Sequence, residues 1–171
     1  MLAFVSARLY SLSMLTPTRF RSALGHFPSG VVAITGRDAD GRPAGMAVSS
    51  FTSVSLDPPL VAFLPGKTSS TFPSLARRGT FCANVLAAGQ EDLCRALSVS
   101  GGDKFAGVDW RPGPHGDPVL DGAVAWIACT IEAVHDAGDH HLVLGRVDDL
   151  AADATAEPLL FFRSQYHHLA A

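Results

Sequence analysis

The stretch that decides the fold runs from Gly45 to Phe63 and reads GMAVSSFTSVSLDPPLVAF. Its apolar residues predict a strand that breaks at Pro58-Pro59, with a second short strand behind the break. The first half also carries five hydroxyl residues, which are Ser49, Ser50, Thr52, Ser53 and Ser55. Since a buried hydroxyl without a partner costs about 1–3 kcal/mol, these groups must find partners.

Two explanations for the hydroxyls stay open at this point. In a strand, successive side chains face opposite sides, and here both sides mix apolar and hydroxyl groups. The first explanation is structural, with Ser and Thr pairing across strands or lying on an exposed edge. The second is a ligand that packs a ring against the apolar groups and accepts hydrogen bonds along a polar tail.

The rest of the chain predicts many short strands and few helices. Thr16 and Pro17 are an N-cap and first-turn pair for a helix that ends at Gly25, and Asp40-Gly41 is a hairpin turn. Further helices are expected over 68–78 and 89–98, and a long loop over 100–122. Further strands are expected over 30–36, 60–64, 80–86, 123–138, 140–150 and 158–169. The pattern predicts a mainly β protein, an antiparallel Greek-key-like barrel with a few short helices over its ends.

Length, composition and charge favour one folded domain. The chain has 171 residues, of which 47% are hydrophobic and 17% charged, which is enough apolar material for a sizeable core. The net charge of −3 and the lack of a Lys/Arg run argue against a nucleic-acid partner. No apolar run is long enough to cross a membrane. We expect residues 1–15 to be a loose or non-native extension and 16–171 to form the domain.

The cysteines and histidines indicate no metal or disulfide chemistry. Cys82, Cys94 and Cys129 are widely spaced in apolar surroundings, which predicts buried free thiols and a reducing, cytoplasmic location. The seven histidines match neither HExxH nor Cys/His finger spacing. The sequence also lacks GxGxxG, GxxxxGK[ST] and GxSxG, so a Rossmann domain, a P-loop and a serine-nucleophile elbow are unsupported.

A second polar cluster follows one strand later, in PGKTSSTF. It combines the charge of Lys67 with the hydroxyls of Thr68, Ser69, Ser70 and Thr71. One of these serines can cap the helix that follows, but a cap uses one hydroxyl rather than four. Backbone N–H groups at a helix start favour anions, so the cluster indicates a phosphate site.

Taken together, six segments resemble the flavin reductase family, the short NAD(P)H:flavin oxidoreductases that serve two-component monooxygenases. The segments, in the family's order from about Phe20 to Tyr166, are FPSGVVAITG, MAVSSFTSVSLDPPLVAF, KTSSTF, FCANVL, KF and GDHHLVLGRV. The resemblance implies a split β-barrel that dimerises and binds FMN or FAD near the subunit interface. The sequence departs from the family's pattern at two positions, at Ser29, where many relatives carry Thr, and at Val48, where many carry Asn.

The resemblance assigns site residues by their match to the family's segments. The expected flavin contacts are Ser29, Ala47, Val48, Ser49, Ser50, Ser53, Val54, Ser55, Lys67, Ser69, Ser70, Thr71, Lys104 and Phe105. The expected contacts of the nicotinamide donor are Asp139, His140 and Tyr166, with His140 positioning the nicotinamide. Gly138 and Asp139 form a tight turn that directs the ring of His140 to the pocket mouth and that of His141 away from it.

The chemistry that the resemblance implies needs no acid, base or nucleophile motif, and the sequence shows none. Hydride transfer from a nicotinamide to a flavin belongs to the two cofactors, so the protein has to stack and orient them. We expect an NAD(P)H-dependent flavin reductase that supplies a partner oxygenase. A flavin-binding electron carrier or store and an unrelated β-barrel binding module remain alternatives, as do FMN against FAD and NADH against NADPH. Excess apolar surface on the paired segments 123–131 and 141–147 favours a homodimer.

Overall fold

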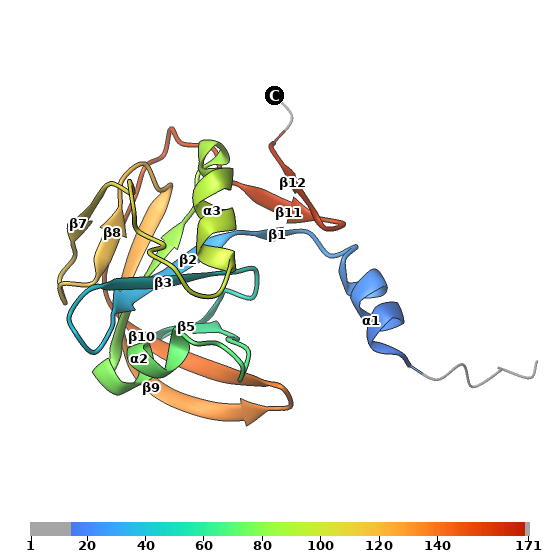
Figure 1. Cartoon of the computed structure of the whole chain (residues 1–171), viewed down its shortest axis with the longest axis horizontal. Coiled ribbons are helices and arrows are strands. Elements are labelled where there is room, and N and C mark those ends of the chain that lie inside the picture. Colours follow the sequence, from blue (N-terminus) through green and yellow to red (C-terminus); the bar gives the residue numbers. More distant parts are fainter. Residues whose placement is uncertain (1–14, 170–171) are drawn as a thin grey trace, which may run out of the picture.

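The computed structural model describes residues 15–169, and this part of the chain is mainly β. Figure 1 shows the strands gathered in one body, with α3 against one side and α1 standing away from it. The helices are α1 (Pro17–Leu24), α2 (Phe72–Arg78), the 3-10 turn η1 (Ala88–Gln90) and α3 (Glu91–Ser98). The strands are β1 (Ser29–Gly30), β2 (Val32–Arg37), β3 (Pro43–Val48), β4 (Thr52–Leu56), β5 (Pro59–Phe63), β6 (Thr80–Val85), β7 (Trp110–Pro112), β8 (Pro118–Leu120), β9 (Ala125–Ala137), β10 (His140–Ala152), β11 (Leu160–Phe162) and β12 (Gln165–His167).

Seven of the strands form one antiparallel sheet in the order β3-β2-β6-β9-β10-β5-β4. The two edge strands, β3 and β4, are joined only by residues 49–51, so the sheet must curl until its edges approach one another. No β3–β4 pairing occurs in the described residues, and the barrel is therefore split at this point. The predicted split β-barrel is confirmed, and the split lies within the stretch Gly45–Phe63.

Both faces of β2 are buried, which explains its continuous β-branched run. Val32 and Ile34 face the barrel interior, where they pack with Phe63, Phe81 and other buried residues. Val31 and Ala33 face the opposite side, in a second cluster with α3 residues. A strand covered on both faces reads as apolar without alternation.

Most predicted elements are present. Thr16 Oγ1 accepts a hydrogen bond from the N–H of Arg19 and caps α1, which Gly25 ends. Gly41 has a φ of 79° in the β2–β3 turn. Cys82, Cys94 and Cys129 are free and buried, as expected.

Three expectations about elements are wrong in detail. The stretch before Pro58 is two strands, because residues 49–51 leave the sheet and the hydroxyl of Ser50 bonds to the backbone of Leu64. The segment 158–169 is a hairpin, in which Arg163 and Ser164 adopt positive φ at the turn. The long loop contains the hairpin β7–β8, whose Leu120 N–H donates to the buried amide oxygen of Asn84.

Two further findings concern the described part of the chain only. None of its helices is long and apolar enough to cross a membrane. Within residues 15–169, no group of three or more His, Cys, Asp or Glu side chains could hold a metal ion. The expectation of a loose extension over 1–15 falls on residues outside the described range, apart from Leu15, which is exposed.

Candidate active site

A groove opens at the split of the barrel and has a volume of about 710 Å³. We call it the hydroxyl groove. Its polar lining comes from the β3–β4 and β5–α2 connections, the end of α3 with the loop after it, and the start of β10. It consists of Ser49, Ser50, Thr68, Ser69, Ser70, Thr71, Ser98, Ser100, Lys104 and His140. Its apolar lining consists of Phe20, Leu24, Met46, Ala47, Val48, Leu64, Pro65, Leu97 and Val99, with Gly66 completing the groove. Such a lining suits a ligand with a flat apolar part and a polar tail.

Several hydroxyls of the groove are used within the chain. The N–H of Leu64 donates to Ser50 Oγ at 3.0 Å, which ties the residue after β3 to the residue after β5. The N–H groups of Thr71 and Phe72 donate to Ser69 Oγ at 3.3 and 3.1 Å, so Ser69 caps α2. These backbone donors are therefore already engaged, and the helix start alone does not make the expected phosphate site.

Other hydroxyls are left over for a ligand. In the part of the chain that the structure describes, the side chains of Ser49, Thr68 and Ser70 make no hydrogen bond. Ser49 and Ser70 are exposed residues that also line the groove. Ser50 therefore has a structural role in the fold, and the ligand explanation stays a prediction, for which the unbonded Ser49 is available.

Lys104 supplies a positive charge at one side of the groove. Its Nζ donates to the carbonyl oxygens of Gly45 and Leu97, both at 3.3 Å, which leaves one N–H of the ammonium group free. Partial burial lowers the pKa of Lys104 below its ordinary value. A half-buried cation that is only partly paired attracts an anion more strongly than an exposed lysine does.

Lys67, which the sequence offered as the phosphate cation, pairs with an acidic side chain, and its contact with the flavin stays a prediction. Its Nζ lies 3.0 Å from Asp136 Oδ1, on the β9–β10 hairpin, and the residue does not line the groove. The hydrogen bond from Lys67 holds the pKa of Asp136 below its usual range. Among the Lys and Arg residues of the described part of the chain, Lys104 is the one that lines the groove.

His140 lies where the sequence placed it, at the start of β10 and in the wall of the groove. Gly138 has a φ of 67°, which permits the tight turn before it. Asp139 Oδ1 lies 2.8 Å from His140 Nδ1, and this contact lowers the pKa of Asp139. The ring of His141 lies 5.4 Å from that of Phe72, outside the groove. The contact with Asp139 fixes the orientation of the His140 ring.

The remaining sequence-predicted residues are spread over several surfaces. Ala47, Val48, Ser49, Ser50, Ser69, Ser70, Thr71 and Lys104 gather in the groove, and Phe105 lines a hollow beside it. Ser53 and Val54 are exposed on the edge strand β4, where a register shift separates Ser53 from Ser55. Ser29 pairs with Phe161 in the small sheet. The residues Ser29, Ser53, Val54 and Ser55 do not line the groove of their own chain. Their assignment to the flavin stays a prediction.

Tyr166 lies against α3 rather than in the groove. Its hydroxyl oxygen is 3.2 Å from Cys94 Sγ, and this hydrogen bond raises the pKa of Tyr166 to about 12. It lines a small hollow of about 140 Å³ together with Val48 and Ser49, which also belong to the groove. Its proposed contact with the nicotinamide donor stays a prediction.

Sequence reasoning missed the residues that α1 and the end of α3 bring to the groove. Phe20, Leu24 and Val99 are about half exposed and line it. The signal of Phe20 and Leu24 in the sequence was ordinary helix amphipathicity, which does not tell a core face from a ligand wall, and Val99 follows α3 in extended conformation with no motif to mark it. Thr68 was present in the second polar cluster but was not assigned a contact.

These features define a mainly β domain with a groove for an amphiphilic ligand, and comparison with known proteins identifies the family. The flavin reductase like domain family matches residues 24–170. A flavin reductase from Pseudomonas putida is 46% identical over 159 residues, which are 93% of this chain and 94% of that protein. The reductase subunit of a flavin-dependent monooxygenase from Rhodococcus jostii is 48% identical over 152 residues, which are 89% and 77% of the two chains.

The solved structures agree with the sequence relatives. An NADH:FAD oxidoreductase from Streptomyces globisporus, in complex with NAD and FAD fragments, superposes with a TM-score of 0.86 at 36% identity. The match covers 92% of this chain and 96% of that one. This chain belongs to the flavin reductase family.

The groove fits a flavin by the chemistry of its lining. Apolar side chains such as Met46 and Leu64 suit the ring system, and the leftover hydroxyls suit its polar edge and sugar chain. Lys104 suits the phosphate. The family match and the similar solved structures confirm the resemblance inferred from the sequence at the level of family and fold.

Proposed function

We propose that this chain reduces FMN or FAD with NADH or NADPH and releases the reduced flavin to a separate flavin-dependent monooxygenase. The observation that carries the proposal is the groove at the barrel split, which combines a wall of apolar side chains, unpaired hydroxyls and the partly paired cation of Lys104. A bound flavin accepts a hydride, with its two electrons, from the reduced nicotinamide, and a proton from water balances the reaction.

The residues of the chain bind and orient the two reactants. Met46, Ala47 and Val48 at the end of β3 pack against the flavin ring, and Ser49 with Ser70 bonds its polar groups. Lys104 pairs with the phosphate. These roles need no acid, base or nucleophile, because holding two reactive rings close together in the right orientation lowers the barrier to hydride transfer.

His140 positions the nicotinamide donor. Its ring is half exposed at the groove wall and is held by Asp139 at 2.8 Å, so it can contact a second ligand that enters above the flavin. Phe20 and Leu24 from α1 and Val99 after α3 border the groove and limit the access of water to it. A reduced flavin must later leave, so these half-exposed side chains close the groove without sealing it.

We also propose that the protein is a homodimer. α1 has no buried residue, and it stands away from the body of the molecule (Figure 1). Phe20, Leu24 and Phe27 are 51%, 53% and 75% exposed, which is an apolar surface that a second copy would cover. Sedimentation of the flavin-bound protein tests this, and a stable monomer that binds flavin tightly would contradict it.

Anaerobic incubation of the purified protein with FMN and NADH, followed by absorbance at the flavin band, tests the proposed activity. Rapid loss of the band supports a reductase. A protein that binds flavin and stays yellow in the presence of NADH and of NADPH would be a flavin carrier or store, and a protein that neither reduces nor binds flavin would be neither a reductase nor a carrier.

A further inference from the structure

Lys67 stands out in the sequence and has no part in the function proposed above. It lies in the β5–α2 connection, residues 64–71, and every other residue of this connection lines the hydroxyl groove. The Lys67 side chain pairs instead with Asp136, at 3.0 Å. A charged side chain that is paired outside a ligand site indicates a role in holding the walls of that site together.

The β5–α2 connection is bound along its backbone to the tip of the β9–β10 hairpin. The N–H of Lys67 donates to the carbonyl oxygen of Asp139 at 2.9 Å. The N–H of His141 donates to the carbonyl oxygen of Pro65, also at 2.9 Å. The connection therefore runs as a short third strand beside the first residues of β10.

The ring of His140 lies against this third strand. Gly66 and His140 form an isolated antiparallel bridge between the two backbone bonds. A Cβ built on Gly66 would stand 3.8 Å from His140 Nε2, whereas Asp139 Oδ1 lies 2.8 Å from His140 Nδ1. The imidazole is thus bordered at one nitrogen by the hairpin turn and at the other by the β5–α2 connection. Its position in the groove wall depends on how these two segments are held together.

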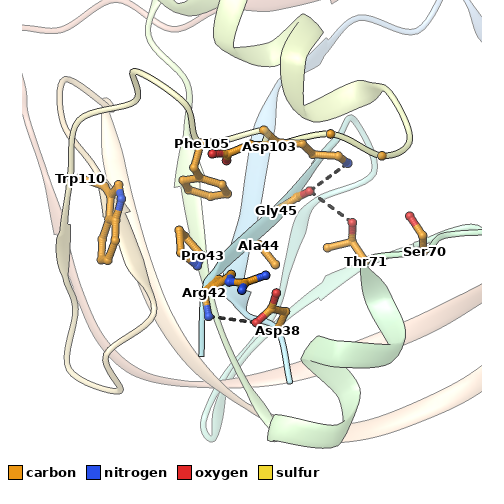
Figure 2. A pocket seen from close by; sticks show the side chains of 13 residues that line it. Asp38, Arg42, Pro43, Ala44, Gly45, Ser70, Thr71, Asp103, Phe105 and Trp110 are labelled. Carbon is orange, nitrogen blue, oxygen red and sulfur yellow. Dashed lines mark hydrogen bonds between the residues drawn. The ribbon is translucent and has the colours of Figure 1, made fainter. Parts of the chain in front are cut away.

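The far end of the connection is fixed to the barrel, whereas the hairpin tip is exposed. Thr71 Oγ1 donates to the carbonyl oxygen of Gly45 in β3 at 3.4 Å (Figure 2). At the tip, 79% of the Asp136 side chain and 95% of the Asp139 side chain are exposed. The tip is therefore the part that has to be held against the connection.

The ion pair between Lys67 and Asp136 ties the connection to the second strand of the tip. Asp136 lies near the end of β9, opposite His141 in the β9–β10 register, so the Lys67 side chain spans β10 to reach it. The backbone bonds hold β10, and the ion pair adds β9. Exposed ion pairs add little to the stability of a whole fold, but a misplacement of about 1 Å in a positioned group can lower a rate strongly.

From these contacts we infer that Lys67 and Asp136 form a clasp that positions His140 for the nicotinamide donor. Both are positioning residues, because they act through the hairpin tip and the β5–α2 connection rather than through a contact with either reactant. The inference rests on the proposed function, since it takes His140 to contact the donor. It gives Lys67 a role other than binding the flavin phosphate.

Steady-state kinetics with saturating FMN and varied NADH test the clasp. Asp136→Asn and Lys67→Met should each raise the KM for NADH about two- to fivefold, which is the range that an exposed ion pair allows. The kcat should change less than the KM, and the dissociation constant of FMN should stay that of the parent. Glu132→Gln is the matched control and should keep the parent's KM, because Glu132 is an exposed carboxylate on the same strand with no ion pair in the described part of the chain.

A double-mutant cycle shows whether the clasp acts through His140. In a His140→Ala protein, which lacks the ring, Asp136→Asn should raise the KM for NADH no further. An equal rise in both backgrounds would mean that Asp136 acts on the donor by itself, and the inference would be wrong. The exchanged pair, Lys67→Asp with Asp136→Lys, should bring the KM back toward that of the parent. High salt should reduce the difference between Asp136→Asn and the parent, because exposed charges are screened.

The imidazole NMR signals of His140 give a readout that needs no activity. They are assigned by their loss in His140→Ala. Asp136→Asn should shift them in the protein without donor, and Glu132→Gln should leave them in place. Thermal midpoints close to the parent's show that the variants fold.

Two results separate this inference from the proposed function. An unchanged KM and unchanged His140 signals in Asp136→Asn, with rapid reduction of FMN by NADH, would overturn the clasp and leave the reductase activity intact. Failure of the parent to reduce any flavin with NADH or NADPH would overturn the proposed function, whereas shifted His140 signals in Asp136→Asn would still show that the clasp holds this ring.

Discussion

Replacing Lys104 by Met separates the role of the phosphate from that of the flavin ring. Lys104 Nζ keeps one N–H free for a ligand beyond its bonds to the carbonyls of Gly45 and Leu97. A hydrogen bond to a charged group contributes about 1.5–3 kcal/mol. Since about 1.4 kcal/mol is tenfold in a dissociation constant, Lys104→Met should weaken FMN binding about ten- to hundredfold. Riboflavin, which lacks the phosphate, should bind within about twofold of the parent.

The assay is paired titration of FMN and riboflavin by fluorescence quenching. The ratio of the two losses cancels any general loosening of the groove. Lys67→Met is the matched control, because its ammonium pairs with Asp136 outside the groove and should not act on FMN selectively. Equal losses of FMN and riboflavin in Lys104→Met, or a selective loss of FMN in Lys67→Met, would refute the assignment.

The difference in affinity between FMN and riboflavin should depend on pH. Burial lowers the pKa of Lys104, so its charge is lost at a lower pH than that of a free lysine. The extra affinity for FMN over riboflavin should be complete below this lowered pKa and disappear as the pH rises through it. Lys104→Met should show no such decline, and a parallel decline in both proteins would point to a different group.

Three further predictions concern the donor, the core and the thiols. His140→Ala should raise the KM for NADH severalfold and lower kcat less than kcat/KM, with His141→Ala as the control; equal effects in both would remove His140 from the site. Gly145→Ala places a Cβ 2.5 Å from Phe81 Cζ and should cost about 1–3 kcal/mol, seen as a thermal midpoint several degrees lower, and an unchanged midpoint would contradict this packing. Burial raises the pKa of Cys82 to about 12, so a thiol reagent at pH 8 should label it only after unfolding.

The parts of the fold that depend on local sequence patterns could be predicted from the sequence. The cap at Thr16, the turn at Gly41 and the β-branched run of β2 each specify local backbone structure directly. The turn at Arg163 and Ser164 could not be read, because neither residue type is a usual choice for positive φ and the hairpin is held by pairing with β1. Tertiary contacts decide such a turn.

The sequence predicted hydroxyl groups that line the groove, but it did not predict which lysine lines it. Ser49, Ser70 and His140, which the family pattern assigned to the flavin and the nicotinamide donor, line the groove, and their contacts with these ligands stay predictions. The sequence offered Lys67 as the phosphate cation because it stands beside the second polar cluster. Its side chain bonds instead to Asp136, which is distant in sequence and comes close only through the β9–β10 hairpin. Lys104 takes its position from two backbone carbonyls, a contact that no motif encodes.

The hydroxyl-rich stretch shows the limit of strand periodicity. Strict alternation would place Ser49, Ser53 and Ser55 on one face. Residues 49–51 leave the sheet and β4 carries a register shift after Ser53, so the alternation is broken twice. Only the first part of the stretch therefore lines the groove, and the second part lies on the outer edge.

The crystal structure of the protein soaked with FMN tests the central claim most directly. We predict flavin density in the groove at the barrel split, against Ala47–Ser50, with the phosphate within hydrogen-bond reach of Lys104 Nζ. Flavin bound on another surface, or its phosphate held by Lys67 rather than Lys104, would contradict the account.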